Sequence, residues 1–445
     1  SLALECELCE TWILENEREY LFELRSGVHW QDIYPLDGRE LNSSDILFSY
    51  DRQSQPDWPN AQLLAAVKSV SAPSVSTVRI IVQEPDADFL LSLADGHSKI
   101  ITEDAVDVYG DLRNGPTVGT GAWILTETRP KVSHMFEKNI DYFEAGFPFI
   151  DKLLIYIIAD PSTRDAAFKV GSIDVMEIDY RQWDELHEKK PEISSVMTHN
   201  VGGGVEVAMK ASVPPFDDIR IRKAVFHSMN PWDAKRDIWL QFDNVSSGFP
   251  NFENEWILDK NHLREYFGNL GFARDLMFES GAELPISVEI KVGDFGDMYL
   301  AYAEYLSAEL NHVGFDTHLE VVNRKQFGKE VWLEGDYQMF VGPTPPVLSP
   351  NGYLMSVLHS LGEWNTTGHV DEVLDYLIET QSQEFDLVKR REVMLEIQRH
   401  VLNNAYRFMP VTGKSMWAWW PRVHNFHPNF AGFEYSHWSR IWLDD

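Results

Sequence analysis

The sequence is poor in positive charge. It contains 38 Lys and Arg against 70 Asp and Glu, which gives a formal net charge of -32 at pH 7. Such a chain repels phosphate backbones and anionic lipid surfaces. We therefore expect no nucleic-acid partner. The acidity favours a soluble protein, or one adapted to salt, and attraction of a cationic ligand is the alternative interpretation.

Long apolar runs and catalytic signatures are also missing. No stretch of about 18 apolar residues is present, which is the length that a membrane-spanning helix needs. The motifs G-x-S-x-G and H-E-x-x-H do not occur. Residues 413–415 resemble the end of a phosphate-binding loop, but Phe408 occupies the position of the required first glycine. The sequence thus predicts neither an enzyme nor a cofactor.

Cysteine and metal-binding patterns are sparse. Cys6 and Cys9 are the only cysteines. A C-x-x-C pair can be redox-active at a helix N-terminus, or can bind zinc with two further ligands. We favour a third interpretation, in which both are small buried side chains. His424 and His427 lie between two prolines, and we predict that they bind no metal.

The most regular part of the chain runs from 115 to 178. A glycine-rich stretch, 115–121, precedes a continuous apolar run at 153–158, which is typical of a strand buried on both faces. Asp160 and Pro161 then mark the start of a helix, and Gly171 is the glycine expected just after its last turn. Because 173–178 resumes strand character, we predict a βαβ unit in a parallel or mixed sheet covered by helices.

A second βαβ unit is predicted further along the chain. Residues 286–292 alternate, 302–313 repeat at helical spacing, Gly314 ends the helix, and 315–321 alternate again. We expect this unit in a different lobe from the first, with two amphipathic helices following around 370–404.

Aromatic residues are abundant, with 15 Trp in an aromatic fraction of 13%. They either line a ligand cleft or fill large cores. The stretch Trp417-Ala418-Trp419-Trp420 cannot place all three indoles on one face of a strand. We predict that Trp417, with Trp419 or Trp420, lines a cleft between two lobes.

Several segments, taken in order, resemble one family. They are YLFELRSGVHW through GRELNSSDILFSYDR at 20–52, VGTGAW at 118–123, NIDYF at 139–143, the 150–176 unit ending in GSIDVM, PFDDIRIRKAV at 215–225, LSAELNHVGFDTHLEVV at 306–322 and MPVTGKSMWAWWPRV at 409–423. Together they resemble bacterial family 5 extracellular solute-binding proteins, the group of oligopeptide- and dipeptide-binding receptors. The resemblance covers nearly the whole chain.

The resemblance implies an α/β, two-lobed periplasmic-binding-protein (Venus-flytrap) fold, type II-like, with an extra subdomain in the first lobe. The expected boundaries are 1–115 for that subdomain, 116–208 with 412–445 for the first lobe, and 209–411 for the second. It also implies a monomeric periplasmic or extracellular receptor that delivers a small-molecule or peptide-like ligand to an ABC transporter permease. The family's first strand and leader have no counterpart here, so we expect an N-terminally incomplete first lobe, and lipid anchoring stays open.

The sequence departs from the family pattern at a residue that holds the ligand in peptide-binding members. In peptide-binding members, an aspartate just beyond the strand matching 336–340 holds the ligand's ammonium group, whereas 341–347 contain no acid here. We therefore predict neutral contacts just after strands, from Tyr180, Thr344, Asn351 and Tyr353. Peptides, opine-like conjugates, metal chelates and oligosaccharides all stay open as ligands.

Closure of two lobes needs crossing segments that absorb a backbone change. We predict hinges at Gly202, Gly203, Gly204 and, near Val411, Gly413; an ordinary glycine loop is the alternative for the triplet. The rival functions are a secreted, glycosidase-like hydrolase with an acidic, Trp-rich cleft and a sensor with the same two lobes.

Overall fold

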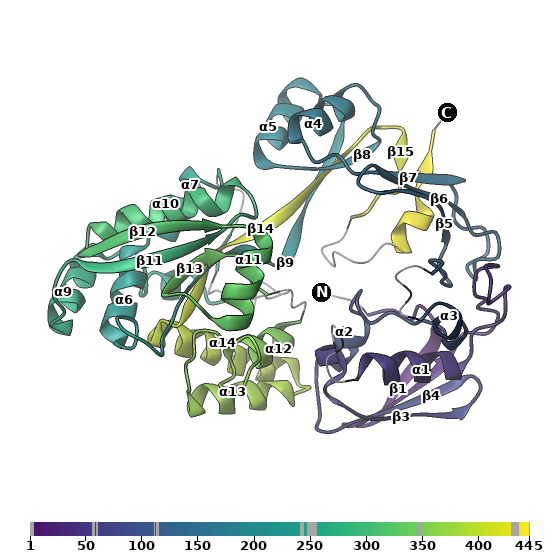
Figure 1. Cartoon of the computed structure of the whole chain (residues 1–445), viewed down its shortest axis with the longest axis horizontal. Helices are drawn as coiled ribbons and strands as arrows, with labels where there is room; N and C mark the ends of the chain where they lie inside the picture. The colour runs from purple at the N-terminus through teal and green to yellow at the C-terminus, as the bar shows by residue number, and fades with distance from the viewer. Residues whose placement is uncertain are drawn as a thin grey trace. The chain divides into compact units, whose positions relative to one another are not determined.

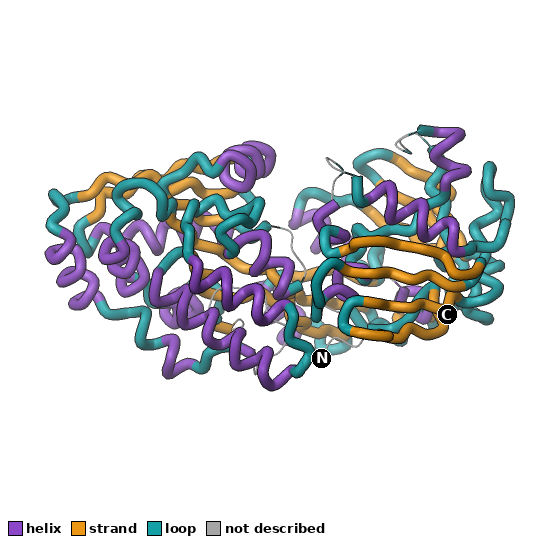
Figure 2. Tube along the Cα trace, turned by 90° about the horizontal axis from the view of Figure 1, so that it is seen from below, coloured by secondary structure: helices purple, strands orange, loops and turns teal. Residues whose placement is uncertain are grey.

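The computed structural model describes residues 4–55, 58, 61–110, 112, 115–240, 244–246, 256–345, 349–428 and 436–444. The chain divides into two compact units (Figure 1). Unit 1 contains His199–Lys414, and unit 2 contains Ala3–Thr198 with Ser415–Asp445. Helices and strands occur in both units, as an α/β fold requires (Figure 2).

Unit 2 begins with a four-stranded antiparallel sheet. Its order is β1 (Cys9–Asn16), β2 (Glu19–Leu24), β4 (Thr77–Val82) and β3 (Val67–Ser74). Helix α1 (Ser43–Gln53) packs on β3 and β4. It begins with a capping box, in which the Asn42 side chain accepts a bond from the backbone and the Asp45 side chain accepts one from the backbone N–H of Asn42.

The two cysteines correct our interpretation of them as small buried residues. Cys6 and Cys9 form a disulfide, and neither is buried. The Arg25 guanidinium donates to the carbonyl oxygens of Glu7, Cys6 and Cys9 at 3.2, 3.5 and 3.3 Å. The disulfide therefore closes a short loop before β1 that Arg25 holds against β2.

The prediction of a first βαβ unit was wrong, although its helix boundaries were right. Strand β7 (Lys152–Tyr156) is the edge of an antiparallel sheet with β6 (Ser133–Lys138) and β5 (Trp123–Arg129), while β8 (Val175–Ile178) pairs antiparallel with β14 (Arg407–Trp419). Between them, α4 (Pro161–Lys169) is capped by Asp160, and Gly171 has a φ of 77°.

The burial expected for this apolar run was wrong as well. Leu154, Ile155 and Tyr156 are 46, 40 and 51% exposed. An uninterrupted apolar run indicates a strand but does not reveal its neighbours. Strand β7 pairs antiparallel with β6, whereas the partner of β8 follows β8 by about 240 residues in the sequence.

The second βαβ unit is confirmed in unit 1. The sheet order is β10 (Asn244–Val245), β14, β9 (Ser194–Met209), β13 (Met339–Gly342), β11 (Ile286–Gly293) and β12 (Phe315–Val322). Strand β11 runs parallel to both β12 and β13, and β9 runs antiparallel to β13. Helix α10 (Asp297–Asn311) packs on β11, β12 and β13 (Figure 1).

The remaining elements complete the description. They are α2 (Phe89–Leu93), α3 (Glu103–Tyr109), α5 (Tyr180–Lys189), α6 (Ile219–Ser228), α7 (Pro231–Asp237), α8 (Lys260–Leu263), α9 (Leu270–Ser280), α11 (Arg324–Phe327), α12 (Pro350–Tyr353), α13 (Glu372–Ser382), α14 (Leu387–Asn404), β15 (Val423–His424), β16 (Trp442–Leu443), the π-helical segments Gly328–Glu334 and Leu354–Leu358, and the 3₁₀ segments Ala61–Leu64 and Ser436–Arg440. Helices α13 and α14 confirm the amphipathic pair predicted around 370–404. Within the described residues, no helix is long and apolar enough to cross a membrane.

A buried histidine predicts how unit 1 responds to acid. His369 is 4% exposed, one ring nitrogen lies 2.7 Å from the Leu358 carbonyl oxygen, and the ring stacks on Tyr406. Burial lowers the pKa of His369 from 6.5 to about 4. The stability that its neutral form contributes is therefore complete above pH 6.5 and is lost as the pH falls toward 4.

We predict that His369→Gln reduces the loss of unfolding free energy between neutral and mildly acidic pH by about 2 kcal/mol. Urea unfolding at several pH values measures this loss. His318→Gln is the control, because the His318 side chain is 65% exposed in the same unit. Equal pH dependence in the two variants would contradict the prediction.

Candidate functional site

The parallel strands of unit 1 end at one edge of their sheet. The register pairs Gly293 at the end of β11 with Val322 at the end of β12, and β13 ends beside β11 at Gly342. Ligands of α/β proteins bind outside the carboxyl ends of such strands. We call these strand ends and the connections that follow them the carboxyl edge, and we take it as the candidate site.

Two glycines allow aromatic rings to cross the carboxyl edge. A Cβ atom on Gly342 would lie 2.2 Å from the ring of Phe327, and one on Gly293 would lie 2.8 Å from the ring of Phe295. Both distances are below ordinary contact. Glycine is therefore required at these strand ends for the rings to occupy their places.

A buried ion pair adjoins the end of β13. Glu206 in β9 is the register partner of Gly342. Its Oε1 accepts hydrogen bonds from Arg407 Nε at 2.8 Å and from the Tyr353 hydroxyl at 2.9 Å. The side chains of Glu206 and Arg407 are 0 and 2% exposed, and Tyr353 is 0% exposed. This network joins α12, β9 and β14.

Burial and charge oppose each other in this network. Burial raises the pKa of the Glu206 carboxyl, and the Arg407 guanidinium opposes that rise without cancelling it. Burial tends to lower the pKa of Arg407, but Glu206 and the neighbouring tyrosines raise it overall. Glu206 Oε2 is buried and has no hydrogen-bond partner among the described residues. The pair is therefore stable only while both members are present.

The predicted neutral contacts fall in two places. Thr344 and Asn351, each 8% exposed, and the fully buried Tyr353 follow β13 at the carboxyl edge. The Asn351 side-chain oxygen accepts a bond from Gln381 at 2.7 Å, and Tyr353 donates to Glu206. Tyr180 is the first residue of α5 in unit 2 and is 9% exposed. Residues 346–348 lie outside the described part of the chain.

The predicted tryptophans lie on β14 in unit 2. The rings of Trp417 and Trp419 lie 5.7 and 5.2 Å from the ring of Phe426, in a cluster with Val423. Trp420 instead donates its indole N–H to the Phe168 carbonyl oxygen at 2.9 Å. The three indoles are therefore divided as strand alternation requires, and the ligand contact of Trp417 and Trp419 stays a prediction.

The proposed hinge glycines lie in strands. Gly202, Gly203 and Gly204 belong to β9, and Gly413 belongs to β14. The boundaries between the two units fall within these same strands, after Thr198 and after Lys414. The triplet is thus not an ordinary loop, and its hinge role stays a prediction.

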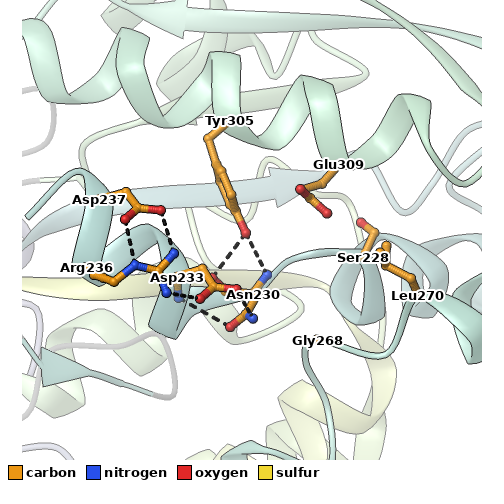
Figure 3. Close-up of a pocket in the computed structure, with 9 residues that line it drawn as sticks. All are labelled: Ser228, Asn230, Asp233, Arg236, Asp237, Gly268, Leu270, Tyr305 and Glu309. Carbon is orange, nitrogen blue, oxygen red and sulfur yellow. Dashed lines mark hydrogen bonds and ion pairs between the residues drawn. The ribbon is translucent and has the colours of Figure 1, made fainter.

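A separate hollow of about 360 Å³ opens on unit 1 (Figure 3). Its lining is mostly polar and includes three acids and one arginine: Ser228, Asn230, Asp233, Arg236, Asp237, Gly268, Leu270, Tyr305 and Glu309. The Tyr305 hydroxyl donates to the Asn230 carbonyl oxygen at 3.1 Å, and Arg236 pairs with Asp233 at 2.6 Å and Asp237 at 2.7 Å. None of the predicted ligand residues lines it.

The histidines considered for metal binding have other partners. His424 Nε2 lies 2.6 Å from Asp444, and His427 Nε2 lies 3.1 Å from the Asn425 side-chain oxygen. Within the described residues, no three His, Cys, Asp or Glu side chains converge to hold a metal ion.

Comparison with known proteins identifies the family. The model of bacterial extracellular solute-binding proteins, family 5 (middle), matches residues 3–365. The chain belongs to this family. Its fold agrees: a periplasmic binding protein associated with an ABC transporter of Helicobacter pylori, in complex with the peptide STSA, has a TM-score of 0.83 at 21% identity, covering 99% of this chain and 90% of that one. The predicted two-lobed α/β solute-binding-protein fold is confirmed.

The family 5 relatives carry different ligand names. The chain is 23% identical to di/tripeptide-binding protein 2 of Pseudomonas aeruginosa over 72% of this chain and 65% of that protein. It is 25% identical to heme-binding protein A of Haemophilus influenzae over 63% of this chain and 54% of that protein. The chain therefore spans less than two thirds of these relatives' lengths.

Sequence reasoning missed the Glu206–Arg407 pair. A signal existed, because Glu206 interrupts an apolar strand between Val205 and Val207, and Arg407 lies between Tyr406 and Phe408. Charges within apolar strands are buried only when paired. Sequence could have suggested that each needs a partner, but not that they are partners of each other.

We predict that the pair is strongly coupled. Arg407→Met leaves a buried carboxylate unpaired and should cost about 3–5 kcal/mol of unfolding free energy, whereas Glu206→Leu with Arg407→Met should cost less than either change alone. Tyr353→Phe removes one hydrogen bond and should cost about 1 kcal/mol. Urea unfolding of the four variants measures the coupling, and additive effects of the two single changes would contradict it.

Proposed function

We propose that the protein is the extracytoplasmic substrate-binding component of an ABC importer. It captures a small solute at the carboxyl edge, passes it to a membrane permease and leaves it chemically unchanged. The observation that carries this proposal is the family 5 match over residues 3–365, together with the fold shared over 99% of the chain. The family supports a binding protein rather than the rival hydrolase.

The chemistry of the carboxyl edge narrows the solute. The described residues that directly follow β13, 343–345 and 349–353, contain no acid. The acid beside them, Glu206, is already neutralised by Arg407. A ligand ammonium group held at the segment after β13 would therefore find no free carboxylate in it, and its desolvation would be uncompensated there. We infer a peptide-like or related solute whose nitrogen is acylated or otherwise uncharged at this position.

Binding without turnover can be measured on the protein as purified. We predict that native mass spectrometry detects one retained small solute per chain, and that the mass of the released solute is unchanged after prolonged incubation with the protein. Conversion of the solute to a smaller product would contradict the binding function.

The missing ammonium anchor gives a separate prediction. Isothermal titration with dialanine and N-acetyl-dialanine should show that acetylation does not weaken binding, because the described segment after β13 offers no carboxylate that could hold the ammonium group. Tight binding of dialanine that acetylation abolishes would contradict the neutral contacts proposed for Thr344 and Asn351.

A further inference from the structure

Four aromatic side chains gather on the connections after β11 and β12. Phe327 is fully buried at the base. Around it, Phe295, Tyr299 and Trp332 are partly exposed. The Phe295 ring lies 5.5 Å from that of Phe327, 6.0 Å from that of Tyr299 and 6.1 Å from that of Trp332. We call these four residues the aromatic surface, and it belongs entirely to unit 1.

The aromatic surface contains a hydrogen-bond donor without an acceptor. The indole Nε1 of Trp332 is buried and has no hydrogen-bond partner among the described residues. A buried N–H without an acceptor costs about 1–3 kcal/mol. Trp332 also lies in the π-helical segment Gly328–Glu334, and such segments are rare and frequent at functional sites. Both features indicate that a group from outside the chain completes this surface.

Arg324 supplies a positive charge next to the rings. Its guanidinium carbon lies 5.3 Å from the centre of the Phe295 ring. Arg324 is exposed and forms no ion pair with a described carboxylate, although the chain carries a net charge of -32. Asp294 and Asp297, in the same connection as Phe295, are exposed to solvent, which screens their charges. The guanidinium fork is therefore available to an anion.

The Tyr299 hydroxyl adds a second neutral donor. Burial raises the pKa of Tyr299 to about 12, against the opposing effect of Arg324. The hydroxyl therefore keeps its proton at neutral pH. A carboxylate near Arg324 would therefore meet the guanidinium cation and, from Tyr299, a neutral hydroxyl rather than a phenolate.

We propose that the aromatic surface with Arg324 is a subsite for a carboxylate attached to a planar aromatic group. The planar group packs on Phe295 and Trp332, and the acyl oxygen that both probes share accepts from the Trp332 indole N–H. The carboxylate accepts hydrogen bonds from the Arg324 guanidinium, whose fork matches its geometry. This inference rests on the proposed solute-binding function, and it names the class of solute: an N-acylated aromatic amino acid or a peptide that ends in one.

The test compares two probes that differ in charge. Isothermal titration should show that N-acetyl-phenylalanine binds the full chain at least about 10-fold more tightly than its neutral amide, because a charge-assisted hydrogen bond is replaced by a neutral one. Arg324→Gln should bring this ratio close to one. Trp332→Phe keeps a ring but removes the N–H donor, and it should weaken both probes.

Lys325→Gln is the matched control, since Lys325 is an exposed cation on the same short helix. It should leave the ratio of the two affinities unchanged. The proposal is overturned if Arg324→Gln behaves like Lys325→Gln, or if N-acetyl-phenylalanine does not saturate the wild-type protein at millimolar concentration. If N-acetyl-phenylalanine does not bind but native mass spectrometry detects a retained solute, only this subsite is rejected. If native mass spectrometry detects no bound solute, the proposed function is rejected.

Discussion

The pair formed by Glu206 and Arg407 is the constraint on which the candidate site depends. Each charge is buried, so each needs the other to offset the cost of leaving water. Because Tyr353 donates to the same carboxylate oxygen, the pair also holds the C-terminal end of α12, the helix that follows β13. The carboxyl edge is thus tied to β9 and β14, the strands in which the chain passes between its two compact units.

This arrangement separates two kinds of polar group at the carboxyl edge. Glu206 and Arg407 are largely satisfied by each other, and Asn351 is bonded to Gln381. Arg324 and the Trp332 indole have no such partner among the described residues. A solute that reached this edge would find its strongest unused interactions at the aromatic surface, rather than at the residues that hold the edge together.

Local features of the fold could be predicted from sequence, and long-range pairings could not. The caps at Asn42 and Asp160 depend on residues three positions apart, so the sequence displays them directly. The second βαβ unit was predictable because its strands are neighbours along the chain and in the sheet. The prediction for the strand at 152–156 was wrong, because this strand pairs with one strand of a hairpin. Its exposure follows from its position at the edge of that sheet.

The sequence could indicate which connection belongs to the candidate site, but not the contacts that its side chains make. The segment after β13 was chosen because residues after strands hold ligands, and Thr344 and Asn351 lie there. The burial of Tyr353 and the packing of Trp417 on Phe426 depend on tertiary contacts that no local pattern contains. Arg324 was missed for the same reason, since its contact with Phe295 joins two connections about 30 residues apart.

The central claim is that solute binds at the carboxyl edge of unit 1. Hydrogen exchange of the full chain, with and without saturating N-acetyl-phenylalanine, tests it most directly. The account predicts that protection increases in the connections after β11, β12 and β13, at residues 294–296, 323–334 and 343–345. Protection confined to the hollow formed by α6, α7 and α10, or no change at the carboxyl edge, would contradict it.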